Sequence, residues 1–348
     1  MLFFVNAHAR KKATRTDVAR LAGVSESTVS YALSGVRSIA DETKERVLAA
    51  AAELGYTPNV MAQGLAGKKT GLLALMFPVS DRGFNPSDYE YITGASKVAE
   101  DAGYQLLMWP NPIDDLESLR RIATQHLVDG VILMEVRGQD ARPEILREAN
   151  IPYVLIGRTD DESENTWVDA DFSLWGPMAI DLLANQGHTE VAFLTQPEQF
   201  YNTGYGPLVR TERDLLARAK ERHIAVHIRR SASSIAAGRE GFEQMRERRP
   251  NVTAVLGMNE LAMIGVLEAM ITVGAETPRD YSVLQFGLSP ASAEMTSLHQ
   301  DTISVEGTEL GAKAAEFLLK RMAGDRTTPL TFLSPPVYVS RGSVGPAR

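Results

Sequence analysis

The residues from Thr14 to Gly35 include polar side chains that could form hydrogen bonds with DNA. If 26–33 forms a helix, Val29, Ala32 and Leu33 would lie on its buried side. Its outer face would carry short polar and hydroxyl groups, from Glu26, Ser27, Thr28, Ser30 and Tyr31. Such groups donate to and accept from both base edges and phosphates.

Local signals predict the elements that would hold this face outward. The first helix, 16–22, would pack its apolar side, and Gly23 can end it in the left-handed conformation. Ser25 can cap the next helix by accepting from backbone N–H groups. The apolar positions that would close a small three-helix core are Val18, Ala19, Leu21 and Ala22, then Val47, Leu48, Ala51 and Leu54. This periodicity also fits an ordinary three-helix bundle fragment.

Three sequence blocks favour the DNA-binding interpretation. In order and spacing they resemble the DNA-binding head of the lactose/galactose repressor family: "TDVARLAGVSESTVSYAL", "ETKERVLAAAAELGYTPN" and "AQGLAGKKT". The resemblance implies an all-α helix-turn-helix head whose recognition helix, 26–33, enters the major groove of operator DNA.

The resemblance also assigns DNA contacts. Glu26, Ser27 and Tyr31 occupy the specificity positions, and Arg15 can add a base contact. A glutamate can accept from cytosine N4 but cannot pair with guanine O6 and N7. The alternative for Glu26 is a solvated carboxylate at a helix start. The positions that match phosphate contacts are Thr14, Ser25, Thr28, Ser30, Ser34, Tyr56 and Asn59.

A short hinge follows the head. The helix expected at 60–66 makes barely two turns and contains Gly64, so it should be marginal without DNA. The resemblance implies that Leu65 is the wedge that enters the minor groove, and we also assign Ala62 to the DNA contacts. A plain linker leucine is the alternative.

From Gly71 onward, strand patterns alternate with amphipathic helices, which predicts an α/β body of two lobes. The resemblance identifies it as a type I periplasmic-binding-protein-like body, with "VDGVIL", "GHTEVAFL" and "NELAMIGVLEAM" as its sharpest blocks. We expect "YQLLMW" to be a buried strand, 157–171 a polar crossing, and "TISV" with the helix after it to return to the first lobe. The expected boundaries are 1–12 for a disordered tail, 13–57 for the head, 58–70 for the hinge and 71–348 for the body, with lobe 1 at about 71–160 and 302–325 and lobe 2 at about 170–288 and 330–342.

Ligands of doubly wound sheets bind beyond the carboxyl ends of the strands, which predicts an effector cleft between the lobes. Arg210 matches a family arginine that hydrogen-bonds effector oxygens. Asp169 and Asp171 both lie near a family aspartate, without a choice between them. Gly287 stands where the family has an aspartate, so the effector need not be a conventional monosaccharide. The remaining candidates are Phe84, Glu135, Arg158, Trp175, Tyr201, Asn259, Glu260 and Phe286, of which the aromatic ones could equally be core residues.

Composition excludes several kinds of chemistry. The chain has 348 residues and no cysteine, so we expect no disulfide, no metal site and no cofactor. No apolar run reaches the length of a membrane span, and the N-terminal segment lacks the pattern of an export signal, which predicts a cytoplasmic protein. Residues 1–70 carry a net charge of +4 and the remainder −12, which fits a DNA-binding head on an acidic body.

These observations predict a transcriptional regulator, a repressor that binds a pseudo-palindromic operator as a homodimer and responds to a sugar-like molecule. The alternative is a two-lobed sugar receptor or an enzyme without a DNA role. The sequence has no G-x-S-x-G, H-E-x-x-H or S-x-x-K motif, so we expect no catalytic residues. Neither alternative accounts for residues 14–66.

Overall fold

The computed structural model consists of two separately packed units, Met1–Thr70 and Gly71–Arg348. It describes residues 13–34, 39–56, 69–77, 87–110, 112–163, 165–289, 293, 299–325 and 330–348. The predictions for Asn59, Ala62, Leu65 and Phe84, and for the side chain of Ser34, lie outside the described residues. None of the helices in the described part of the chain combines the length and apolar character that a membrane span needs.

The described part of the first unit is a bundle of three helices, α1 (Arg15–Ala22), α2 (Glu26–Ser34) and α3 (Asp41–Glu53). Thr14 and Asp17 form a reciprocal capping box at the start of α1. Gly23, with φ of 66°, ends that helix. The backbone N–H of Thr28 donates to Ser25 Oγ at 3.1 Å, which caps α2 as predicted.

The core of this bundle is narrower than the sequence suggested. Val18, Val29 and Val47 are fully buried at its centre, and alanines surround them. The expected core residues Leu21, Leu48 and Leu54 are instead exposed by 46%, 46% and 37%. Buried positions on α3 are spaced three or four residues apart from Val47, so Leu48 falls about 100° off that stripe. Our prediction that these three leucines belong to the core was wrong.

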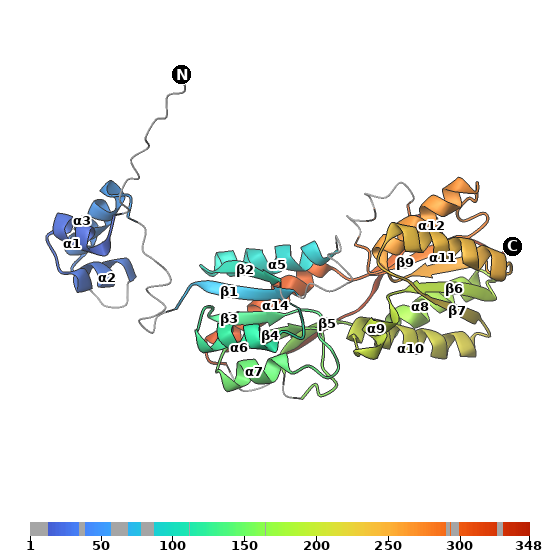
Figure 1. Cartoon of the computed structure of the whole chain (residues 1–348), viewed down its shortest axis with the longest axis horizontal. Helices are drawn as coiled ribbons and strands as arrows, with labels where there is room; N and C mark the ends of the chain where they lie inside the picture. The colour runs from blue at the N-terminus through green and yellow to red at the C-terminus, as the bar shows by residue number, and fades with distance from the viewer. Residues whose placement is uncertain are drawn as a thin grey trace, which may run out of the picture. The chain divides into compact units, whose positions relative to one another are not determined.

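The second unit contains two lobes, each with a six-stranded sheet covered by helices (Figure 1). The first sheet has the strand order β11-β5-β4-β3-β1-β2, and all of its pairs are parallel. Its elements are β1 (Leu72–Phe77), α5 (Asp88–Asp101), β2 (Gln105–Pro110), α6 (Leu116–Thr124), β3 (Gly130–Leu133), α7 (Arg142–Glu148), β4 (Tyr153–Ile156), β5 (Trp167–Ala170), α14 (Gly307–Met322) and β11 (Thr331–Ser334).

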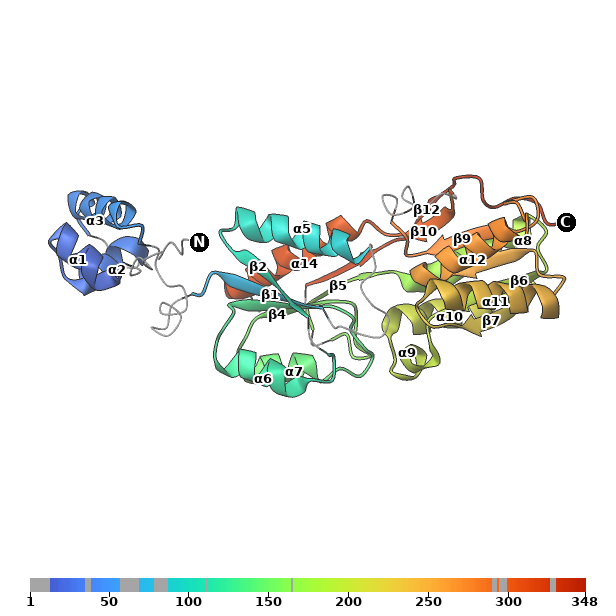
Figure 2. The same cartoon turned by 45° about the horizontal axis from the view of Figure 1, so that its top comes forward.

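The second sheet has the order β12-β10-β9-β8-β6-β7, with β12 antiparallel to β10. Figure 2 shows its helices on both faces, as the doubly wound pattern requires. Its elements are α8 (Phe172–Asn185), β6 (Glu190–Thr195), α9 (Glu198–Asn202), α10 (Gly206–Glu221), β7 (Ala225–Arg230), α11 (Ile235–Arg248), β8 (Ala254–Gly257), α12 (Glu260–Thr272), β9 (Ser282–Phe286), β10 (Asp301–Ser304) and β12 (Val337–Val339).

The strands of the body differ from our expectation in four places. β10, which contains most of "TISV", lies in the second sheet, and only the helix after it, α14, returns to the first lobe. β11 belongs to the first sheet, although we placed 330–342 in lobe 2. The expected polar crossing contains β5, a buried strand of the first sheet. β2 pairs only along β1 and is mostly exposed, because it is an edge strand.

Glycines allow two pairs of helices to approach closely. A Cβ atom at Gly94 of α5 would meet the backbone of Thr308, and one at Gly311 of α14 would meet that of Tyr91. The second lobe repeats this arrangement between Gly238 of α11 and Gly265 of α12. Each pair brings two backbones together over its sheet, which fixes the helices that frame the lobes.

Candidate DNA-binding surface and effector cavity

The polar face of α2 is held by hydrogen bonds within the head. Ser25 Oγ lies 2.7 Å from Ser27 Oγ and 2.8 Å from Thr28 Oγ1. Ser25 and Ser27 are exposed, while Thr28, Ser30 and Tyr31 are half-buried. The hydroxyl groups therefore form a pre-positioned cluster at the start of α2, where a recognition helix contacts DNA.

Glu26, the first residue of α2, is bound to the start of α1. Its Oε2 accepts from Arg15 Nε at 3.2 Å and from Arg15 Nη2 at 3.0 Å. Its Oε1 accepts from Thr16 Oγ1 at 2.8 Å. The bonds from Thr16 and Arg15 hold the pKa of Glu26 below its ordinary value. Both carboxylate oxygens of Glu26 therefore accept hydrogen bonds in the head by itself, and a contact between Glu26 and cytosine stays a prediction.

A cavity of about 140 Å³ lies between the lobes of the body. The first lobe contributes residues after β3, β4 and β5, and the second contributes residues after β6, β8 and β9. This is the edge where the carboxyl ends of the parallel strands meet, as predicted for doubly wound sheets. The predicted residues in its wall are Glu135, Asp169, Trp175, Glu260 and Phe286, together with Gly287.

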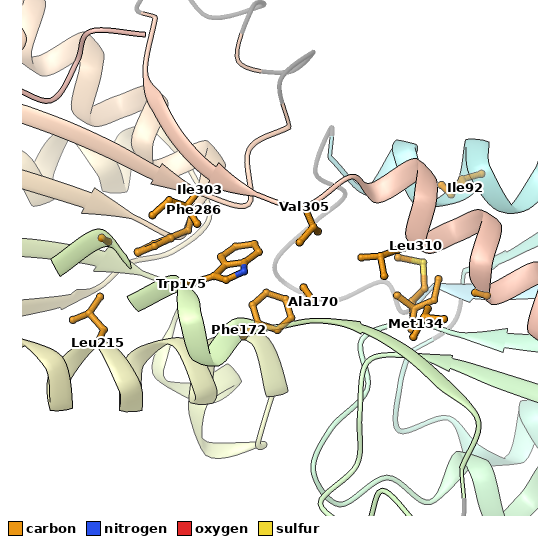
Figure 3. Packing of buried hydrophobic residues seen from close by; sticks show 14 of the residues in the cluster. Ile92, Met134, Ala170, Phe172, Trp175, Leu215, Phe286, Ile303, Val305 and Leu310 are labelled. Atoms are coloured by element: carbon orange, nitrogen blue, oxygen red, sulfur yellow. The ribbon is translucent and has the colours of Figure 1, made fainter. Parts of the chain in front are cut away.

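An aromatic group forms the side of the cavity that belongs to the second lobe. The ring of Trp175 lies 4.6 Å from that of Phe172, one turn earlier on α8, and stacks 6.1 Å from that of Phe286. Figure 3 shows Trp175 between Phe286 and Phe172, with Met134 and Leu310 of the first lobe farther along. Trp175 Nε1 is buried and has no hydrogen-bond partner among the described residues. The wall therefore contains an unused donor beside apolar faces.

Asp169 joins the two lobes through arginines. This carboxylate, at the end of β5, accepts at Oδ2 from Arg158 Nε and from Arg210 Nη1, each at 2.9 Å. Arg210 comes from α10 of the second lobe and also donates to the backbone oxygen of Arg158 at 2.9 Å. Burial raises the pKa of Asp169 to about 6, against the opposing effect of both arginines. Arg158 and Arg210 thus hold Asp169 in the cavity wall, and their own side chains do not line the cavity.

Three other predicted residues have local structural roles away from the cavity wall. Asp171 caps α8 by accepting from the N–H of Ser173, which leaves Asp169 as the aspartate that faces the cavity. Asn259 caps α12 and donates to the backbone oxygen of Ser231 at 3.0 Å. The guanidinium carbon of Arg230 lies over the ring of Tyr201, 4.7 Å from the ring centroid. These three side chains do not line the cavity, and helix capping and packing occupy them instead.

Sequence reasoning missed several wall residues. Gln196 directly follows β6, so the rule applied to the other strand ends would have found it. Phe172 lies three residues before Trp175, on the same side of a helix. Tyr91 lies on α5, and only the packing of the lobes brings it to the cavity. Within the described ranges, no group of three or more His, Asp or Glu side chains is arranged to hold a metal ion.

Comparisons with known proteins agree with both units. Residues 14–59 match the family model of bacterial regulatory proteins, lacI family, and residues 180–344 match that of a periplasmic binding protein-like domain. The HTH-type transcriptional regulator AscG of Escherichia coli (strain K12) is 30% identical over 336 residues, which cover 92% of this chain and 95% of AscG. The HTH-type transcriptional regulator CelR of Thermobifida fusca is 28% identical, over 92% of this chain and 95% of its own.

Solved structures show the same fold. The lac repressor dimer bound to operator and the anti-inducer ONPF is 23% identical, covers 96% of this chain and all of its own, and superposes with a TM-score of 0.80. A LacI family regulator from Silicibacter pomeroyi is 25% identical, with coverages of 95% and 99% and a TM-score of 0.79. The helical head, the two-sheet body and these relatives agree: the chain belongs to the lacI family of bacterial regulatory proteins.

Proposed function

We propose that this protein is a transcriptional repressor that binds a pseudo-palindromic operator as a homodimer and changes its affinity when a small molecule enters the cavity between the lobes. The observation that carries this proposal is the head, in which a capped α1, a tight turn and α2 present a pre-positioned polar face. Each head is large enough to read only a few base pairs, so two copies related by a twofold axis suit a palindromic site.

The cavity supports a hydroxyl-rich effector such as a sugar. Its wall combines aromatic faces with carboxylates, which accept from hydroxyl groups, and with the indole N–H of Trp175, which can donate to one. One similar solved structure is a CelR complex with cellobiose, and one relative is the ribose operon repressor. Gly287 has φ of 74°, so an aspartate at this position would be strained, and the effector must be held without it.

The hydrogen bonds of Arg210 can transmit the binding of an effector from the cavity to the head. Its bonds to Asp169 and to the backbone oxygen of Arg158 cross from the second lobe to the first, directly behind the cavity. A ligand that shifts Asp169 changes these bonds and therefore the relation between the lobes. Because the head precedes β1 of the first lobe, that relation can set the spacing of two heads in a dimer.

We infer a non-enzymatic, cytoplasmic role from the relatives. AscG and CelR are regulators by name, and a regulator of this kind acts where the chromosome is. The residues proposed for the cavity bind and orient a ligand, and no catalytic role is assigned to them.

The full chain can be tested by selection from a library of random DNA duplexes. We expect enrichment of a pseudo-palindrome, bound with a stoichiometry of two chains per duplex. A one-to-one complex would contradict the homodimer, and the absence of any enriched sequence would refute sequence-specific binding.

The effector can be sought by thermal shift with ribose, cellobiose and a panel of other neutral sugars, since a ligand of the folded form raises the melting temperature. Trp175→Phe should weaken a ligand that uses the indole N–H by about 10-fold. Trp109→Phe, in the edge strand β2, is the matched control and should leave affinity unchanged. Equal affinity in all three proteins would remove Trp175 from the contacts.

A further inference from the structure

We propose that Arg15 and Glu26 act as one reading unit, in which Arg15 binds a guanine of the operator and Glu26 holds the guanidinium in place. This inference rests on the proposed DNA-binding function and replaces the expectation that Glu26 itself reads a cytosine. Within the unit, Arg15 is the base-contacting residue and Glu26 is a positioning residue.

The hydrogen bonds to Glu26 leave one edge of the Arg15 guanidinium available for a base. A guanidinium has one N–H at Nε and two at each terminal nitrogen. Glu26 Oε2 takes the Nε–H and one hydrogen of Nη2, at 3.2 Å and 3.0 Å, which are the donors of the side edge. One hydrogen of Nη1 and the second hydrogen of Nη2 then form the end edge, and this fork matches the O6 and N7 acceptors of guanine.

Glu26 is poorly placed to read a base directly. Both of its oxygens already accept, Oε2 from Arg15 and Oε1 from Thr16 at 2.8 Å. Three of the about four acceptor sites of the carboxylate are thereby taken, so a cytosine N4 group would have to share Oε1 with Thr16. Holding the guanidinium costs the carboxylate nothing further, since these bonds exist in the head by itself.

The pair is accessible to a duplex. The side chains of Arg15 and Glu26 are exposed by 52% and 44%. They join the first residue of α1 to the first residue of α2, the end of a recognition helix that contacts base edges. An exposed ion pair stabilises a fold by no more than about 1 kcal/mol. Its effect should therefore be on the orientation of the arginine rather than on folding.

The test uses the full chain and its selected duplex, in which each guanine of one half-site is replaced in turn by 7-deazaguanine. This base lacks the N7 acceptor but leaves the cytosine N4 amino group of the pair intact. For the wild-type chain, replacement at one position should weaken binding by about 5-fold to 100-fold, the range of a bidentate arginine contact. Arg15→Lys keeps the charge but replaces the planar fork by a single ammonium group, so it should discriminate less strongly between the normal and modified duplexes at that position.

Glu26→Gln removes the charge that orients the arginine. We expect it to reduce the discrimination between the two duplexes by up to about 5-fold, and to have no further effect when Arg15→Lys is already present. Arg20→Lys is the matched control, because Arg20 lies on the same helix with a side chain exposed by 76%, and its discrimination should equal that of the wild type. Circular dichroism of each variant checks that the head is folded.

Two results would overturn the inference while leaving operator binding intact. One is a wild-type chain that binds a selected sequence yet tolerates 7-deazaguanine at every position. The other is Arg15→Lys that keeps the full sensitivity to it. If no duplex is selected at all, the proposed function fails first, so the two failures are distinguishable.

Discussion

Arg210 Nη1 and Asp169 Oδ2 lie 2.9 Å apart and join α10 of the second lobe to the end of β5 in the first. Both side chains are largely withdrawn from water, with 15% and 4% exposed. Beside the cavity, this buried ion pair thus spans the two lobes, and Arg158 of the first lobe binds the same carboxylate oxygen.

Arg210→Ala should destabilise the body and uncouple it from its effector. Removing one partner of a buried pair leaves the other charge poorly compensated, so we expect the free energy of unfolding to fall by about 2–4 kcal/mol. All three tryptophans, at 109, 167 and 175, lie in the body, so their fluorescence during urea unfolding reports on this unit alone.

Operator affinity should no longer change when the effector binds to Arg210→Ala, because the bonds that the ligand would shift are absent. Arg213→Ala is the control on the same helix. Its side chain is 64% exposed and pairs with its neighbour Asp214, so a change below about 0.5 kcal/mol is expected. An intact effector response in Arg210→Ala would contradict the role of the cross-lobe pair.

His188 should make the body less stable at acidic pH. Its ring lies within hydrogen-bond distance of Thr253 Oγ1 at Nδ1 and of Ser282 Oγ at Nε2, and Nε2 donates to the backbone oxygen of Gly345. Burial lowers the pKa of His188 below its ordinary 6.5. The unfolded chain therefore takes up a proton first as the pH falls below 6.5, and the stability that the neutral ring contributes is lost there.

Urea unfolding at pH 7.5 and pH 5.5 checks this expectation. The drop in unfolding free energy should be larger for the wild type than for His188→Gln, which has no ring to titrate. Equal drops in the two proteins would show that the pH dependence arises elsewhere.

Gly94→Ala should push α5 away from α14. The added Cβ would approach the backbone carbonyl carbon of Thr308 to 2.8 Å and the N of Ala312 to 2.9 Å, and backbone atoms cannot rotate aside. Overpacking of this kind typically costs about 1–3 kcal/mol. Lys97→Ala, at an exposed site on the same helix, controls for the change in helix composition. A melting temperature as high as that of the wild type would show that the helices can separate without cost.

Operator affinity should fall steeply with salt. Contacts between the Lys and Arg side chains of the head and the phosphates release counterions, so the logarithm of the affinity should decrease linearly with the logarithm of salt concentration. Fluorescence anisotropy between 50 mM and 200 mM salt measures the slope, and a loss of at least about 10-fold is expected. A neutral sugar bound in the cavity should show little such dependence, and a flat slope for DNA would contradict phosphate contacts.

Local chemistry made several elements predictable. Gly23 ends α1 and Ser25 caps α2 because each acts on backbone atoms a few residues away, so their neighbours in the sequence are sufficient. The strands of the body were recognisable for the same reason, since buried parallel strands consist of short apolar runs. β5 was missed because Asp169 interrupts such a run, and only its two arginine partners explain a buried carboxylate there.

The amino-acid sequence by itself determined the helix-turn-helix head, the alternation of strands and helices, and the edge of the sheets where a ligand would lie, because these follow from periodicity and short-range hydrogen bonds. Only the tertiary structure decided that β10 lies in the second sheet and β11 in the first. It also decided that Asp169 and not Asp171 faces the cavity, and that Glu26 accepts hydrogen bonds from Arg15. Each of these depends on partners that are distant in the chain or on the direction of a side chain, and the free energy of such contacts is not encoded in any local pattern.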